Sequence, residues 1–298
     1  MSEKPALHIV FTMNCQPAAT RSAPEGPKSW EQSIRSIDGF STRLINAGFP
    51  VTLFLAPRCL EEHGPFVEEL AERGVELGLY FQPRTLYGRG YNRCLGHYAR
   101  DAQRDIVTLS MGAFQDVVGE RPLSCRSDWF SANDDTFSVV SELGFRQGSV
   151  SNPGRTVAQH AARWSGAESD AHYADRSSRL QAGDLPFLEL PVTADSTQST
   201  GGLSPDLAIE NGTFEDWHRP LIEGQLERMD REGEPFRALC LYTRNCFAYG
   251  VAADRYAQTV DALIAYFGSL DDRYDVVPLT LAGAHSRYRV LRLEYTGR

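Results

Sequence analysis

Short apolar runs alternate along the chain with longer segments in which apolar residues recur at helical spacing. The runs predict eight strands, at 7–12, 50–55, 76–81, 123–126, 145–150, 187–192, 238–243 and 275–281. The segments of helical period lie at 30–47, 60–73, 101–118, 134–143, 214–231 and 254–267. Regular alternation of strand and helix is typical of a parallel sheet covered by helices. Glycines follow several of the helices, and these repeated junctions make a (β/α) barrel the simplest architecture.

Two polar segments do not fit a bare barrel. They cover 17–28, directly after the first strand, and 151–184, after the fifth. Unstructured loops of this length inside a compact domain are usually functional covers. No linker or repeat divides the chain, so we expect a single domain over residues 1–298 with two loop insertions.

Composition and charge exclude several classes of protein. The 298 residues carry a net charge of −9 and contain no Lys/Arg run, which argues against nucleic-acid binding. No stretch approaches the roughly 18 apolar residues that span a bilayer. The N-terminus lacks a cleavage signal after a long apolar segment, so we expect a cytoplasmic protein. The six cysteines form no CxxC pair, which is typical of reduced thiols.

Polar and aromatic residues follow the predicted strands. In a barrel, residues just beyond the strand ends face one common pocket. Asn14 with Gln16, and Tyr80 with Gln82 and Arg84, occupy alternate positions, so each group should project together. Each amide taken alone could instead satisfy backbone groups of a turn.

The order of the strand-end motifs resembles that of the polysaccharide deacetylase family (NodB-homology, carbohydrate esterase family 4). The similar stretches are IVFTMNCQ (9–16), PVTLFLAP (50–57), GVELGLYFQP (74–83), RPLSCRSDWFSANDDTFSVVSELGFRQGSVSNPG (121–154) and FLELPVT (187–193). The resemblance covers roughly residues 7–193 and, less closely, 238–245. It implies an α/β fold, a distorted (β/α) barrel, and removal of acyl groups from carbohydrates by a divalent metal, usually zinc.

The metal-site positions implied by the resemblance all hold other residues. The family's base Asp falls on Asn14 and its neighbouring acid on Cys15 or Gln16. The first metal histidine falls on Tyr80, and the second on Gln82 or Arg84. Carboxamides are neutral and are poor ligands for zinc, and Asn14 cannot take a proton from water. We therefore expect no metal or other cofactor.

The charged and aromatic residues that remain define candidate roles. Arg126 stands at the position of the family's third-motif arginine, and Asp128 and Asp195 follow the fourth and sixth strands; these three are the candidate catalytic residues. Arg84 and Arg244 could bind an anionic group, and Tyr80 and Trp129 could stack on a ring. The alternative is that each arginine pairs with a carboxylate of the protein.

Three hypotheses about function follow. The first is a deacetylase-like pseudoenzyme that binds a carbohydrate-like or acylated, anionic small molecule. In the second, the protein still hydrolyses a non-peptide C–N bond by metal-independent chemistry. The third is a structural role, as an assembly partner of an active homologue or in a homo-oligomer. The candidate ligand-binding residues are Asn14, Gln16, Tyr80, Gln82, Arg84, Trp129 and Arg244.

Overall fold

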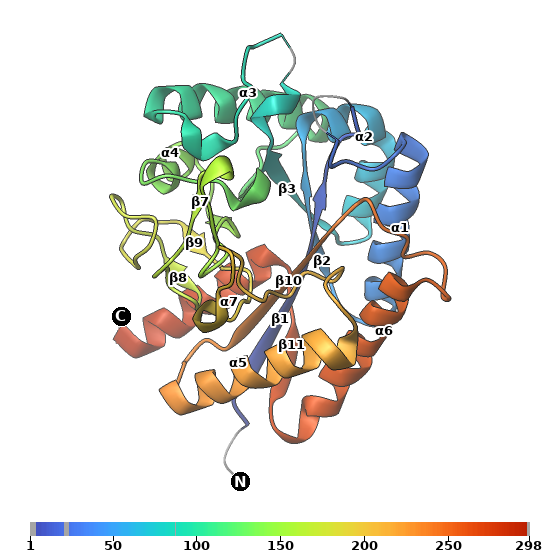
Figure 1. Cartoon of the computed structure of the whole chain (residues 1–298), viewed down its shortest axis with the longest axis vertical. Coiled ribbons are helices and arrows are strands. Elements are labelled where there is room, and N and C mark those ends of the chain that lie inside the picture. Colours follow the sequence, from blue (N-terminus) through green and yellow to red (C-terminus); the bar gives the residue numbers. More distant parts are fainter. Residues whose placement is uncertain (1–3, 21–23, 87, 297–298) are drawn as a thin grey trace.

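A mostly parallel nine-stranded sheet forms the centre of the molecule, which is a computed structural model that describes residues 4–20, 24–86 and 88–296. Strands β10, β1, β2, β3, β4, β5, β9 and β8 are neighbours in that order, and β11 pairs with β1 (Figure 1). The strands are β1 (Ala6–Cys15), β2 (Val51–Leu55), β3 (Glu76–Phe81), β4 (Ser124–Ser127), β5 (Gln147–Gly148), β8 (His172–Tyr173), β9 (Leu188–Glu189), β10 (Ala238–Arg244) and β11 (Asp275–Pro278). All eight predicted strands are therefore present in one sheet.

Strand β1 is the axis of the sheet because it has three parallel partners. It pairs with β10 along one edge, from His8 to Asn14. Along its other edge, its N-terminal half pairs with β11 and its C-terminal half with β2. Nine of its ten residues are buried, which explains its nearly continuous apolar sequence.

The gap between β9 and β10 is bridged by irregular backbone. The Thr193 N–H donates to the Cys240 carbonyl (3.1 Å), and the Tyr242 N–H donates to the Leu207 carbonyl (3.2 Å). Leu207 in turn donates to the Thr193 carbonyl (3.0 Å). These bonds curl the sheet into a distorted barrel, which confirms the predicted fold class.

Helices surround the sheet (Figure 1). They are α1 (Trp30–Asn46), α2 (Pro57–Glu72), α3 (Arg100–Val118), α4 (Thr136–Glu142), α5 (Arg219–Glu232), α6 (Arg255–Gly268) and α7 (Leu281–Thr296). Each predicted helix is present, with ends that shift by a few residues. Helix α1 forms where predicted because its N-cap Ser29 accepts a hydrogen bond from the Gln32 N–H and its apolar face buries Ile37, Phe40 and Leu44. No helix in the described part of the chain is long and apolar enough to cross a membrane.

Helix α7 was not predicted, and it covers the end of the barrel at which the strands begin. Glu76 at the start of β3 accepts the Ala282 N–H (2.9 Å). His285 Nδ1 lies 2.9 Å from the Gln147 side-chain oxygen at the start of β5. Because β11 ends at Pro278 and α7 begins at Leu281, His285 lies on this helix at the opposite end of the barrel from the strand-end pocket.

The two insertions behave differently. Segment 151–184 contains a two-stranded antiparallel ribbon, β6 (Thr156–Val157) with β7 (Ala162–Arg163), and also β8. These strands are too short to leave a periodic pattern in the sequence. In segment 17–28, residues 21–23 lie outside the described residues, and Glu25 is held by an ion pair with Arg84 (2.7 Å).

Candidate functional site

A fully buried arginine lies under the open end of the barrel. Arg126, on β4, donates to Asn14 Oδ1 (3.0 Å), to Thr12 Oγ1 (2.8 Å) and to both the carbonyl and hydroxyl oxygens of Ser149 (2.7 and 2.6 Å). Its guanidinium carbon lies 4.5 Å from the ring centre of Phe54. Burial lowers the pKa of Arg126. Arg126 therefore fixes the strand ends rather than contacting a ligand in the cavity above it.

Above Arg126 lies a cavity of about 470 Å³ at the carboxyl ends of the strands. Asn14 and Gln16 of the first strand end and Tyr80 of β3 line it. All three are nearly fully buried, and Gln16 Oε1 has no hydrogen-bond partner among the described residues. Burial raises the pKa of the Tyr80 phenol, which stays a neutral hydroxyl. The cavity floor is thus polar and uncharged.

A strained turn after β4 supplies an aromatic wall. Trp129 and Phe130 both have left-handed backbone conformations, with φ of 55° and 59°, which large side chains rarely adopt. Trp164 Nε1 donates to the Phe130 carbonyl (2.7 Å) and holds the turn. The Trp129 ring stacks on His160 with centroids 4.3 Å apart. Such strain is typical of functional sites, and here it directs Trp129 into the cavity wall.

The opposite wall comes from segment 203–217, which the sequence reasoning missed. Asp206 accepts from Asn152 (2.7 Å), Asn211 (2.9 Å), the Tyr242 hydroxyl (3.0 Å) and the Ala208 N–H (3.2 Å). Burial nevertheless raises the pKa of Asp206. Its carboxylate is fully hydrogen-bonded and serves to organise this wall. The segment has no periodic pattern, so only its position after the sixth strand could have indicated it.

Two arginines line the cavity in different electrostatic states. Arg244 pairs with Glu210, Nε to Oε1, at 2.9 Å. Arg155, from the 151–184 insertion, is half-buried and makes no side-chain hydrogen bond or ion pair within the described residues. Its guanidinium carbon lies 5.7 Å from the ring centre of Phe130. Arg155 was missed, although the length of the insertion predicted a functional cover.

Asp128 lies next to the cavity but does not line it. It is completely buried, and neither carboxylate oxygen has a hydrogen-bond partner among the described residues. The nearest cation is Arg84, at 3.5 Å. Burial raises the pKa of Asp128 to about 7, against the opposing effects of Arg84 and Cys94. Asp128 is therefore a carboxyl group that can gain or lose a proton near neutral pH.

Three other predicted site residues lie outside the cavity wall. A short 3-10 helix, Pro83–Thr85, follows β3 and ends the strand alternation, so Gln82 and Arg84 do not project beside Tyr80. Arg84 instead pairs with Glu25 and Asp128, in agreement with the alternative prediction that each arginine pairs with a carboxylate of the protein. Asp195 begins another 3-10 turn, accepts from Thr197 and Gln198, and faces a separate hollow.

The residues at the family's metal positions do not fit a metal ion. Asn14 Oδ1 already accepts from a guanidinium, whose positive charge would repel a cation. Tyr80 is a neutral phenol, and Gln16 offers only a carboxamide oxygen. No group of three or more His, Cys, Asp or Glu side chains in the described ranges could hold a metal ion.

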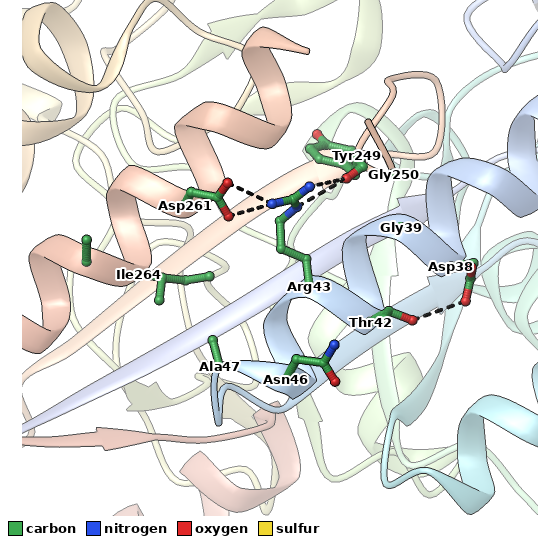
Figure 2. Close-up of a pocket in the computed structure, with 11 residues that line it drawn as sticks. Asp38, Gly39, Thr42, Arg43, Asn46, Ala47, Tyr249, Gly250, Asp261 and Ile264 are labelled. Atoms are coloured by element: carbon green, nitrogen blue, oxygen red, sulfur yellow. Dashed lines mark hydrogen bonds and ion pairs between the residues drawn. The ribbon is translucent and has the colours of Figure 1, made fainter. Parts of the chain in front are cut away.

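A more open hollow of about 610 Å³ lies on the outside of the barrel between α1 and α6 (Figure 2). Arg43 crosses it, donating to both oxygens of Asp261 (2.6 and 2.7 Å) and twice to the Tyr249 carbonyl (3.0 and 3.1 Å). These bonds use four of the five N–H donors of Arg43. The hollow is thus a junction between helices, and the strand-end cavity is the better candidate site.

Comparisons with known proteins identify the fold. No family model matches the sequence, and no curated protein matches it significantly. Among solved structures, a Mycobacterium smegmatis protein described as a polysaccharide deacetylase superposes with a TM-score of 0.64 at 17% identity, covering 98% of this chain and 93% of its own. PuuE allantoinase gives a TM-score of 0.63 at 13% identity, covering 97% of this chain and 92% of its own. A Pseudomonas aeruginosa PAO1 protein described as a polysaccharide deacetylase gives a TM-score of 0.63 at 13% identity, covering 95% of this chain and 91% of its own. The chain therefore has the distorted (β/α) barrel fold of the polysaccharide deacetylases.

Proposed function

We propose that the strand-end cavity binds a small carbohydrate-like or acylated molecule without metal-dependent hydrolysis. The observation that carries this proposal is the neutral polar floor of Asn14, Gln16 and Tyr80, in which a buried Gln16 oxygen has no hydrogen-bond partner among the described residues. A buried acceptor without a partner is costly, and a ligand hydroxyl or N–H would satisfy it. A purely structural role would need no such cavity.

The shape and lining of the cavity support a sugar-sized ligand. Its volume of about 470 Å³ lies within the range of small-molecule sites. Trp129 on one wall and Trp217 on the other offer flat apolar faces, and the amides offer hydrogen bonds between them. The likeness to two proteins described as polysaccharide deacetylases supports a carbohydrate, and the likeness to an allantoinase supports a small molecule with C–N bonds.

Ligand titration tests this proposal. Titrating N-acetylglucosamine and its β-1,4-linked dimer into the protein should change tryptophan fluorescence saturably, and EDTA should not alter the affinity. Replacing both Trp129 and Trp217, which line the cavity, by Phe should remove most of the signal. Replacing Trp30 of α1, whose ring packs edge-to-face on the His63 ring of α2, by Phe is the matched control and should leave the signal unchanged. Stoichiometric zinc in protein purified without chelator, or binding that requires added metal, would contradict the proposal.

A second candidate function, hydrolysis of an amide or N-acyl bond, is favoured by Asp128. A general base is most effective when its pKa lies near the working pH, and burial places Asp128 at about 7. In this mechanism Asp128, which adjoins the cavity, takes a proton from a water whose oxygen attacks the acyl carbon, and it returns that proton to the nitrogen as the C–N bond breaks and the amine leaves. The charge of Arg126 beneath the floor stabilises the oxyanion formed in between without contacting it. Asp195 cannot share this role because it faces another hollow.

Turnover assays separate the two candidates. If the protein hydrolyses the acyl group, Asp128→Asn should abolish product release while the affinity for the same compound changes little. A wild-type protein that binds N-acetylglucosamine but releases no acetate over days supports binding alone. Asp195→Asn is the matched control and should change neither the affinity for the ligand nor the rate of hydrolysis.

The free thiols support a reducing compartment, and we propose a cytoplasmic location. All six cysteines are unpaired, and five of them are buried. Fractionation of cells that express the tagged full chain tests this location.

A further inference from the structure

Arg155 is the one cation lining the cavity wall that makes no ion pair with a carboxylate among the described residues. Arg84 pairs with Glu25 and Asp128, Arg244 pairs with Glu210, and Arg126 is buried beneath the floor. Arg155 makes no ion pair among the described residues, and its buried Nε has no acceptor. A guanidinium presents five donors in a planar fork that matches an oxyanion. Arg155 is thus the group in this cavity that a ligand anion would satisfy.

A hydroxyl group without a partner adjoins Arg155. Ser204 lines the same cavity, is 8% exposed, and its buried Oγ has no hydrogen-bond partner within the described part of the chain. A Cβ atom added at Gly154 would lie only 2.2 Å from Ser204 Oγ, so the hydroxyl contacts the backbone immediately before Arg155. Two unsatisfied donors therefore lie on one wall of the cavity.

The carboxylate of Asp206 shares this wall but does not use these donors. Four other groups hydrogen-bond to it. No Arg155 nitrogen lies within ion-pair distance of it, although the charge of Arg155 counteracts the rise in the pKa of Asp206. A ligand oxyanion would thus displace no protein contact of Arg155.

We infer that the ligand of this cavity carries an oxyanion, a carboxylate or a sulfate or phosphate ester, which Arg155 and Ser204 bind while the rest of the molecule lies against Trp129 and Gln16. This inference rests on the proposed function and narrows its ligand to acidic carbohydrate-like molecules. The neutral floor and Arg155, which has no ion pair among the described residues, together select one negative group at one end of the ligand.

The test compares a charged sugar with its uncharged ester. D-glucuronate and methyl D-glucuronate are titrated into the wild-type protein and followed by tryptophan fluorescence and calorimetry. The wild type should bind glucuronate at least about tenfold more tightly than the ester, because only the carboxylate can form a charged hydrogen bond with Arg155. Arg155→Gln should abolish this preference, Arg155→Lys should retain part of it, and Ser204→Ala should reduce it. Raising the salt concentration should weaken only the binding of glucuronate.

Arg163→Gln is the matched control, because Arg163 is exposed in the same insertion and the variant has the same net charge as Arg155→Gln. The Arg163→Gln variant should keep the full wild-type preference for glucuronate over its ester. Equal affinity of the wild type for glucuronate and its ester overturns the inference, and would mean that Arg155 only balances Asp206. If N-acetylglucosamine binds and glucuronate does not, the inference fails and the proposed function stands. If none of these sugars binds, both fail.

Discussion

Arg126 donates a 3.0 Å hydrogen bond to Asn14 Oδ1 under the cavity floor, at the position where the deacetylase resemblance places the family's catalytic base. All hydrogen-bond partners of this buried guanidinium are neutral. A carboxylate at position 14 would therefore meet a cation already in place, whereas one at position 16 would not. This asymmetry leads to the first prediction.

Asn14→Asp should be at least as stable as the wild type at pH 7. The new carboxylate gains a charge-assisted bond from Arg126, which offsets its cost of burial. Gln16→Glu buries a carboxylate that has no cation to pair with among the described residues, and it should lower the free energy of unfolding by about 2 kcal/mol or more. Urea denaturation of both variants measures the difference. Similar losses in the two variants would show that Arg126 does not reach position 14.

The pH dependence of stability should reflect Asp128. Burial raises its pKa from 3.8 to about 7, so the folded protein retains a proton that the unfolded chain releases in this range. The contribution of Asp128 to the free energy of unfolding is fully present below pH 3.8. It decreases as pH rises toward 7, by at most roughly 1.4 kcal/mol per pH unit. Asp128→Asn should remove this slope and be more stable than the wild type at pH 8.

Thermal unfolding from pH 4 to pH 8 checks the prediction for Asp128. Asp105→Asn, an exposed substitution on α3, is the control and should keep the wild-type slope. An Asp128→Asn variant with the same slope as wild type would place the titrating group elsewhere.

The junction in Figure 2 predicts opposite effects for two glycine substitutions in helices. A Cβ at Gly39 of α1 would lie 2.5 Å from Gly250 N, whereas a Cβ at Gly112 of α3 meets no atom within 4 Å. Gly39→Ala should destabilise the protein by about 1 to 3 kcal/mol, because it separates α1 from the Tyr249 carbonyl that Arg43 binds. Gly112→Ala should stabilise it by about 0.5 to 1 kcal/mol through helix propensity. Denaturant midpoints measure both changes, and stabilisation by Gly39→Ala would contradict the packing.

Regular elements could be predicted from the sequence because each has a periodic apolar pattern. The cavity residues Asn14, Gln16, Tyr80, Trp129 and Arg244 could be placed there because each lies at or just beyond the carboxyl end of a strand. Arg84 could not, since Pro83 indicates that the strand ends there but does not specify the 3-10 turn that follows. Arg155 and Asp206 come from irregular segments whose paths depend on tertiary contacts. Helix α7 was missed because arginines interrupt its apolar stripe and Val290 and Leu293 are exposed.

The position of α7 depends on a partly buried carboxylate, that of Glu76, at its first turn. Glu76 Oε2 accepts from the Ala282 N–H and from the Thr52 hydroxyl, both at 2.9 Å, and Oε1 accepts from the Ser124 hydroxyl. Gln147 also donates to Ser124 (2.7 Å), so the hydrogen of the Ser124 hydroxyl is directed to Glu76. The carboxylate accepts all these bonds and also stabilises the N-terminus of α7 through its negative charge.

Glu76→Gln should loosen α7 because the amide nitrogen is a donor in a site that supplies only donors. One hydrogen bond is lost and the helix end loses its negative partner, which should cost about 1 to 3 kcal/mol. Hydrogen exchange should become faster over 281–296 before it changes in β1, and thermal unfolding should begin earlier. Glu69→Gln, an exposed substitution on α2, is the matched control and should change neither measurement. Unchanged exchange in 281–296 would mean that apolar packing alone holds α7 on the barrel, with Glu76 contributing nothing to its position.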